Sequence, residues 1–189
     1  MNLINNVAAK EQLEIWKNSL TDINLMFEKE FSPLTSQQLY YKPSTTTWSI
    51  AENMQHLIQV NESYYPIFQQ LLDKEFQPAW SGRYEILYNS LGKILLKSVR
   101  PDRKNKVKTF PLWQPHLQNN SPEILPDLLS HNIALTGWMD KLLPFIGNKT
   151  VISSPANKYI SYTLDLAFEI MINHEKRHFN QAKGLNIKA

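Results

Sequence analysis

Two histidines and a glutamate near the end of the chain have the types and spacing that metal chemistry requires. His174 and His178 are four residues apart, with Glu175 between them, in the stretch INHEKRHFNQAK. Residues four apart lie on one face of an α-helix, so both imidazoles can bind the same metal ion. The stretch also matches the H-E-x-x-H pattern of zinc peptidases, in which the glutamate is a general base. A third interpretation is an exposed histidine pair at a fraying helix end.

The sequence supports a zinc-peptidase site less than it supports a different kind of metal site. The residues after His178, FNQAKGLNIKA, contain no histidine, aspartate or glutamate to act as a further ligand. Glu175 is also rotated by about 100° from His174 around the helix axis, toward a polar face. We therefore interpret Glu175 as a solvated surface acid, and we expect a third ligand to come from upstream in the chain.

The upstream histidines are His56, His116 and His131. His56 lies beside Leu57 at the edge of an apolar helical face, where it can be presented to the C-terminal pair by a neighbouring helix. His116 falls in a loop, and His131 lies beside Asn132 near the start of another predicted helix. We interpret His116 and His131 as structural or surface histidines, which leaves His56 as the favoured candidate.

Amphipathic helices account for most of the chain. Apolar residues recur at alternating intervals of three and four in four segments, which is the period of a helix with one buried face. We predict helices over four ranges: approximately residues 10–31, 49–74, 121–146 and 161–183. The last one ends before Gly184, a residue that favours helix termination.

Four helices with this spacing predict an all-α protein built as a four-helix bundle. The connection over residues 75–120 is too long for a bare loop, so we predict a short helix over residues 84–96 within it. Residues 148–162 are expected to form an extended or irregular loop. We expect residues 1–189 to form a single domain.

Composition and charge narrow the class of protein. The chain has no cysteine, which excludes disulfides and thiolate metal ligands. The net charge is +3, and basic residues are concentrated between Lys93 and Lys108. The strip has the charge to meet nucleic acid, but its stretch RPDRKNKVK lacks interleaved aromatic residues, so we interpret that stretch as a solvated loop. No signal peptide and no membrane helix are expected, and a cytoplasmic location follows as the default.

Two motifs resemble those of the DinB-like superfamily of helical-bundle proteins. A W-S-x-x-E-x-x-x-H-L pattern opens the second predicted helix, and an H-x-x-x-H pattern lies near the end of the fourth. The residues that match are Trp48, Ser49, Glu52, His56, Leu57, His174 and His178. Because the motifs fall on the expected helices in the expected order, the resemblance spans nearly the whole chain.

The resemblance implies both a fold and a metal site. The fold would be a four-helix bundle in up-down-down-up order, with the long segment between the second and third helices as its crossover. The site would be a three-histidine centre formed by His56, His174 and His178. Three histidines leave a divalent ion with open positions, as in catalytic sites, and they suit zinc, nickel or iron(II).

The resemblance also implies a metal-dependent enzyme acting on a small molecule. Relatives are thought to transfer a low-molecular-weight thiol, such as bacillithiol or mycothiol, to an electrophile, and others are described as metal-dependent hydrolases. Because this chain has no cysteine, any thiol must come with the substrate. The alternative is a non-catalytic bundle that keeps a metal for stability or partner binding. A homodimer is also expected, with Trp80 and Trp113 as exposed residues at its contact.

Several neighbours of the motifs are further candidates for the site. Glu52 can accept a hydrogen bond from a ligating histidine, but its spacing from Ser49 favours a helix capping box. Trp48, Asn61 and Gln181 are weaker candidates for lining a pocket in front of the histidines.

Overall fold

The protein is mainly helical, in agreement with the predicted fold class. The computed structural model describes residues 3–103, 109–115 and 123–185. Its longer helices are α1 (Leu3–Phe31), α3 (Ile50–Glu62), α5 (Glu85–Val99), α6 (Ile124–Lys141) and α7 (Leu164–Lys183). Shorter helices are α2 (Ser36–Tyr40) and α4 (Tyr65–Leu72), and 3₁₀ turns cover Trp80–Arg83, Pro111–Trp113 and Leu143–Phe145.

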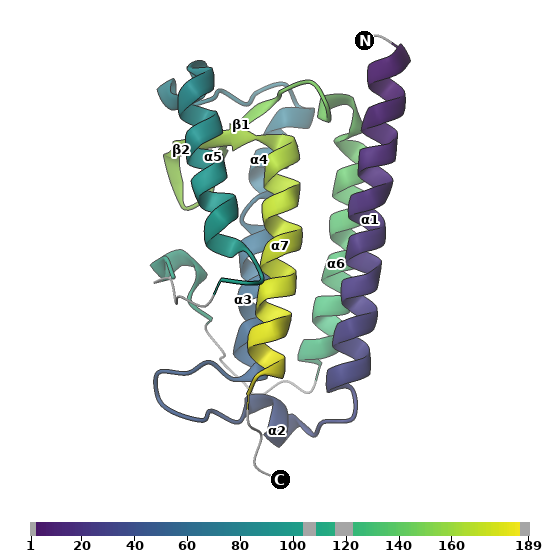
Figure 1. Ribbon diagram of the computed structural model, residues 1–189, viewed down its shortest axis with the longest axis vertical. Coiled ribbons are helices and arrows are strands. Elements are labelled where there is room, and N and C mark those ends of the chain that lie inside the picture. Colours follow the sequence, from purple (N-terminus) through teal and green to yellow (C-terminus); the bar gives the residue numbers. More distant parts are fainter. Residues whose placement is uncertain (1–2, 104–108, 116–122, 186–189) are drawn as a thin grey trace.

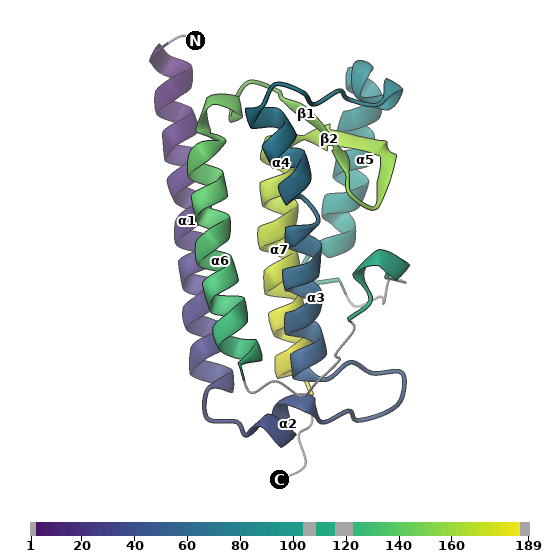
Figure 2. The ribbon, with the colours of Figure 1, turned by 180° about the vertical axis from the view of Figure 1, so that it is seen from behind.

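The long helices pack side by side along one axis. α1 lies against α6, and α3 lies against both α6 and α7 (Figure 1 and Figure 2). α1 and α7 run down Figure 1, whereas α3 and α6 run up it. α5 packs on the outer side of α7, next to a small sheet at one end of the helices. The C-terminal half of α7 therefore faces the start of α3.

A small sheet forms where we predicted an extended or irregular loop over residues 148–162, so the extended backbone was predicted but the pairing of two strands was not. Strands β1 (Val151–Ser154) and β2 (Asn157–Thr163) form an antiparallel hairpin in which Ile152 faces Tyr162. Both of these side chains are fully buried, so the hairpin contributes directly to the core. The serine-rich sequence does not alternate cleanly between polar and apolar residues, which is why the strands give a weak signal.

The second predicted helix is wrong as a single element, because it is broken into α3 and α4. Pro66 lies in the first turn of α4, and α3 ends at Glu62, four residues earlier. Proline has no backbone N–H, and its ring clashes with the carbonyl group four residues before it. The apolar face nevertheless continues across the break, since Tyr64 and Phe68 are both buried.

The other boundaries differ from the prediction by smaller amounts. α1 begins at Leu3 and not near residue 10, and α2, which was not predicted, is stabilised by a capping box between Thr35 and Gln38. The predicted start of the third helix at residue 121 lies outside the described residues. Residues 161–163 belong to β2, and Thr163 caps α7. The helix predicted over residues 84–96 is confirmed as α5.

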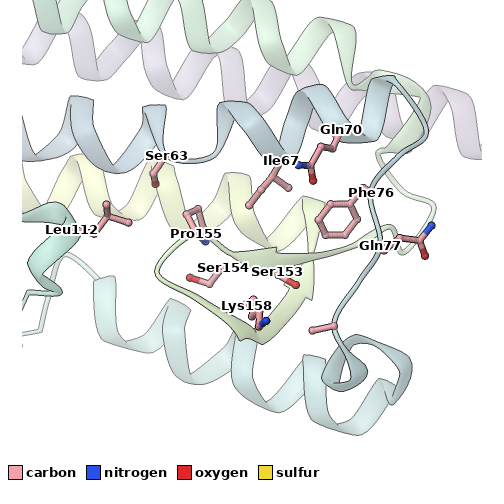
Figure 3. A pocket seen from close by; sticks show the side chains of 11 residues that line it. Ser63, Ile67, Gln70, Phe76, Gln77, Leu112, Ser153, Ser154, Pro155 and Lys158 are labelled. Atoms are coloured by element: carbon pink, nitrogen blue, oxygen red, sulfur yellow. The ribbon is translucent and has the colours of Figure 1, made fainter.

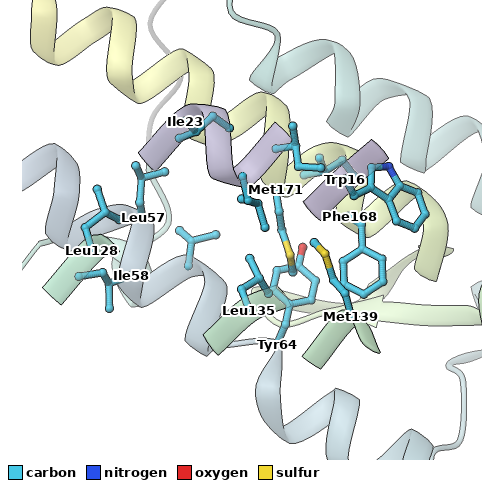
Figure 4. Packing of buried hydrophobic residues seen from close by; sticks show 14 of the residues in the cluster. Trp16, Ile23, Leu57, Ile58, Tyr64, Leu128, Leu135, Met139, Phe168 and Met171 are labelled. Carbon is cyan, nitrogen blue, oxygen red and sulfur yellow. The ribbon is translucent and has the colours of Figure 1, made fainter. Parts of the chain in front are cut away.

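The apolar faces that define the predicted helices form one buried cluster between them (Figure 4). Aromatic rings from three elements meet there: the Trp16 and Phe168 ring centroids are 5.2 Å apart, and those of Phe68 and Phe168 are 5.7 Å apart. The cluster holds α1, α4 and α7 at fixed distances, and it extends to the hairpin through Tyr162. The core therefore sets the positions of the helices that carry the histidines.

α5 approaches α7 closely because it has a glycine at the contact. A β-carbon placed on Gly92 would lie 2.3 Å from Leu166 Cδ2 and 2.9 Å from Tyr162 Cβ. In contrast, a β-carbon on Gly137 of α6 would meet no atom within 4 Å. Gly92 thus lets α5 lie against both α7 and β2.

We predict that Gly92→Ala lowers the free energy of unfolding by about 1–3 kcal/mol, because Tyr162 and Leu166 must shift to admit the methyl group. Gly137→Ala is the matched control, and it should stabilise the protein by about 0.5–1 kcal/mol because alanine favours a helix interior. Chemical denaturation of both variants measures the two effects. A stabilised Gly92→Ala variant would contradict the close packing of α5.

Candidate metal centre

Three histidines from two helices converge at one point. α3 supplies His56, and α7 supplies His174 and His178. The Nε2 atom of His174 lies 3.3 Å from His56 Nε2 and 3.0 Å from His178 Nε2. One nitrogen from each of the three side chains lies within 4.8 Å of the others, the arrangement of a group that can hold a metal ion. The structure thus brings together the three residues proposed from the sequence, and their role as ligands stays a prediction.

Hydrogen bonds on the outer nitrogens fix how two of the rings point. His56 Nδ1 donates to the backbone carbonyl of Trp113 over 2.6 Å, because a carbonyl can only accept. His178 Nδ1 lies 2.7 Å from Asn53 Oδ1, while Nδ2 of the same amide donates to the carbonyl of Ser49. With the proton on Nδ1, the Nε2 atoms of His56 and His178 carry lone pairs, as a metal ligand must.

The site also keeps its imidazoles neutral. Burial lowers the pKa of His56 to about 4, partly opposed by its hydrogen bond to Trp113. Burial, followed by the charges of neighbouring histidines, lowers the pKa of His174 and His178 well below the usual value. Neutral imidazoles are the form that binds metal, because a protonated ring has no lone pair on either nitrogen.

The donor set fits a divalent ion. Ligand nitrogens at about 2.0–2.1 Å from zinc in tetrahedral geometry are separated by about 3.3 Å. The two Nε2–Nε2 distances to His174, 3.3 Å and 3.0 Å, are close to this separation. The Nε2 atoms of His56 and His178 are acceptors that both face His174 Nε2, and a cation placed among the three nitrogens would bind all of them.

The histidines lie in the wall of a hollow of about 790 Å³. Trp48, Phe110 and Trp113 contribute aromatic surface to it, and Tyr64 lies in the same wall. A second hollow of about 570 Å³ lies between α4 and the hairpin, where Ile67, Phe76 and Pro155 line it (Figure 3). The lining of this second hollow contains no histidine, so the candidate metal centre faces the first hollow.

Comparison with known proteins assigns the family. A sequence model described as the DinB superfamily matches residues 25–182, which is most of the chain. The chain belongs to the DinB superfamily. No curated protein and no solved structure matches it.

The residues that resemble DinB motifs have defined positions around the centre. Trp48 stacks on the His178 ring, with centroids 5.9 Å apart, and contacts the His56 ring at 4.8 Å. Ser49 and Glu52 form the predicted capping box at the start of α3, and Glu52 also pairs with Lys42 over 2.7 Å. The first DinB motif therefore both starts the helix and shields the histidines.

The prediction that Glu175 is a solvated surface acid is wrong. Its side chain is fully buried, and Asn61 Nδ2 donates to its carboxylate over 2.8 Å. Burial raises the pKa of Glu175 to about 7, partly opposed by hydrogen bonds from Asn61 and Asn132. Because the carboxylate is tied to α3 within the core, it is not placed to act as the general base of a peptidase. Asn61 is thus a core residue and not part of the hollow.

The remaining sequence candidates have separate positions. His131 is buried and stacks on Tyr65, with centroids 5.7 Å apart, so it is structural as predicted. His116 lies outside the described residues. Trp80 is 57% exposed, but Trp113 is half-buried, and its indole N–H donates to Ser63 Oγ over 3.1 Å. Trp113 also accepts from His56 through its carbonyl, so it lies beside the three histidines and is less exposed than predicted, and its part in a dimer contact stays a prediction.

Sequence reasoning missed two parts of the site. Asn53 lies three residues before His56, so their shared helical face was a signal that could have found it. Arg177 lies in the wall of the hollow, and its guanidinium Nη1 donates to the carbonyls of Arg100 and Arg103. Residues 104–108 of the basic strip lie outside the described residues. No helix in the described part of the chain has the length and apolar character to cross a membrane.

We predict that Glu175→Leu lowers the free energy of unfolding by about 1–3 kcal/mol, because it leaves the Asn61 amide buried without its acceptor. Glu175→Gln should cost much less, since its side-chain oxygen can still accept from Asn61. Urea denaturation of the two variants at one pH tests this difference. Equal stability of Glu175→Leu and the wild type would contradict the buried hydrogen bond.

His131 should make the protein sensitive to acid. Burial lowers the pKa of His131 from 6.5 to about 4, so the unfolded chain binds this proton more tightly than the folded protein does. Neutral His131 leaves the free energy of unfolding unchanged above pH 6.5. As the pH falls toward 4, the proton that His131 takes up on unfolding lowers this free energy by about 3 kcal/mol. We expect the fall in stability between pH 7 and pH 4 to be smaller in His131→Gln, as measured by denaturation at each pH.

Proposed function

We propose that the protein is a metal-dependent enzyme of the DinB superfamily that acts on a small molecule, as a thiol transferase or as a hydrolase. The observation that carries this proposal is the convergence of three imidazole Nε2 atoms in the wall of an open hollow. A structural metal site in proteins is normally closed by four protein ligands, whereas a catalytic site keeps a position for substrate or water. Three histidines facing a hollow match the second type.

The residues of this chain would hold the metal and shape the space in front of it. His56, His174 and His178 are the proposed ligands of a divalent zinc, nickel or iron ion. When bound, that ion would supply a Lewis acid that lowers the pKa of a thiol or of water. Trp113 and Asn53 keep two rings in the tautomer that binds metal, and Trp48 excludes water from one side of them. The thiol comes with the substrate because the chain has no cysteine.

The architecture proposed for this function is a single-domain bundle in up-down-down-up order. α1, α3 with α4, α6 and α7 would be its four helices, and the segment that contains α5 would be the crossover. The opposite directions of the α1–α7 and α3–α6 pairs support this assignment.

The alternative is a bundle that binds metal without catalysing a reaction. The observation that favours it is the burial of two of the three histidines, because a metal held there would tie α3 to α7 and stabilise the fold. The two functions make different predictions for turnover.

We predict that the purified protein binds one zinc, nickel or iron ion, and that His56→Ala weakens this binding by at least about 100-fold through loss of one ligand. His131→Gln, which removes a buried histidine outside the group of three, should bind metal as the wild type does. Metal analysis combined with titration against a competing chelator measures the affinity. Unchanged affinity in His56→Ala would rule out the proposed ligand set.

Activity is tested on the metal-loaded protein with a panel of low-molecular-weight thiols and electrophiles, and with a panel of esters. Turnover that is lost in His56→Ala and kept in His131→Gln supports the enzyme. A large fall in melting temperature on metal removal, with no turnover on any substrate, supports the non-catalytic alternative.

A further inference from the structure

The hollow in front of the histidines has an uneven charge. Among the described residues that line it, the basic ones are Lys42, Arg103 and Arg177, and the only acidic one is Glu52. Glu52 is already engaged, because one of its oxygens accepts from Lys42 and the other accepts from the backbone N–H of Ser49. Lys42 thus pairs with Glu52, and Arg103 and Arg177 add two further positive charges to the lining of the hollow.

Arg177 holds its charge close to the metal centre. It lies on α7 between His174 and His178 in sequence, and it is only 7% exposed. Its side chain lines the same hollow as His174 and His178. Its guanidinium is fixed in this position by the carbonyls of Arg100 and Arg103, at 3.1 Å and 2.9 Å.

Arg103 brings a second positive charge to the same place. Its side chain is exposed and lines the same hollow, and its backbone carbonyl accepts from the Arg177 guanidinium over 2.9 Å. Two guanidinium groups that line one hollow repel one another, and an anion bound between them would convert this repulsion into attraction. Guanidinium groups also match the geometry of carboxylates and phosphates with two parallel hydrogen bonds.

We propose that the hollow selects substrates that carry an acidic group, carboxylate or phosphate, which binds at Arg103 and Arg177 while the reacting end reaches the three histidines. This inference rests on the proposed function only in taking the hollow as the substrate site. A divalent ion on three neutral histidines would add positive charge to the hollow, which favours anions further. Trp48, Phe110 and Trp113 then contact the uncharged part of the molecule.

The test compares charged and neutral ligands of the same size. Succinate and methyl phosphate are the acidic probes, and succinamide is the neutral counterpart of succinate. Binding to the full-length zinc-loaded protein is measured by calorimetry and by the fluorescence of Trp48 and Trp113, which line the hollow. We expect at least one acidic probe to bind more tightly than succinamide.

Three variants assign that binding to the arginines. Arg103→Gln should weaken binding of the acidic probe about tenfold and leave succinamide unchanged, because a charge-assisted hydrogen bond is lost. Arg177→Gln should act in the same direction, and circular dichroism checks that it remains folded, since Arg177 also holds the end of α5. Arg83→Gln is the matched control, because Arg83 is exposed and does not line the hollow.

The outcome separates this inference from the proposed function. Equal binding of succinate and succinamide, or equal binding of the acidic probes to the wild type and Arg103→Gln, would overturn the acidic substrate class. The same titrations with metal-free protein report on the arginines alone. If the wild type fails to bind zinc but still distinguishes succinate from succinamide through Arg103, the inference stands and the proposed metal enzyme does not.

Discussion

The contact between α3 and α7 is the constraint on which the metal centre depends. His56 belongs to one helix and the His174–His178 pair to the other, so a shift of one helix along the other would separate the three nitrogens. Two side-chain hydrogen bonds join the same helices nearby: Asn53 to His178, and Asn61 to Glu175. Such bonds are directional, whereas apolar packing alone tolerates sliding.

The buried polar side chains between α3 and α7 lower the stability of the bundle. Imidazoles, amides and a carboxyl group occupy positions that apolar side chains would fill at lower cost, because each buried polar group gives up its contacts with water. The cost appears in the lowered pKa values of the histidines and in the raised pKa of Glu175. The apolar cluster around Phe68 and Phe168, toward the other end of the helices, compensates for this cost in free energy. Sites that break local rules in this way are where function is expected.

The sequence predicted the parts of the fold that depend on local periodicity. Helices with apolar faces were recognised because each one carries its pattern within a few turns, and the face of α1 from Leu13 to Phe27 is buried as its spacing indicated. Pro66 was overlooked because the apolar pattern continues on both sides of it. The burial of Glu175 could not be read locally, since its partner Asn61 is distant in the chain. The carbonyl of Trp113 has no side-chain signature at all.

The segment between α4 and α6 contributes to the site in two ways at once. The Trp113 carbonyl sets which nitrogen of His56 carries the proton, while Arg103 and Phe110 form part of the wall that a bound molecule would touch. The orientation of His56 and the shape of the hollow thus depend on one segment of the chain. A protein engineer who grafted a different connection here to change the wall of the hollow would therefore also remove the carbonyl that orients His56.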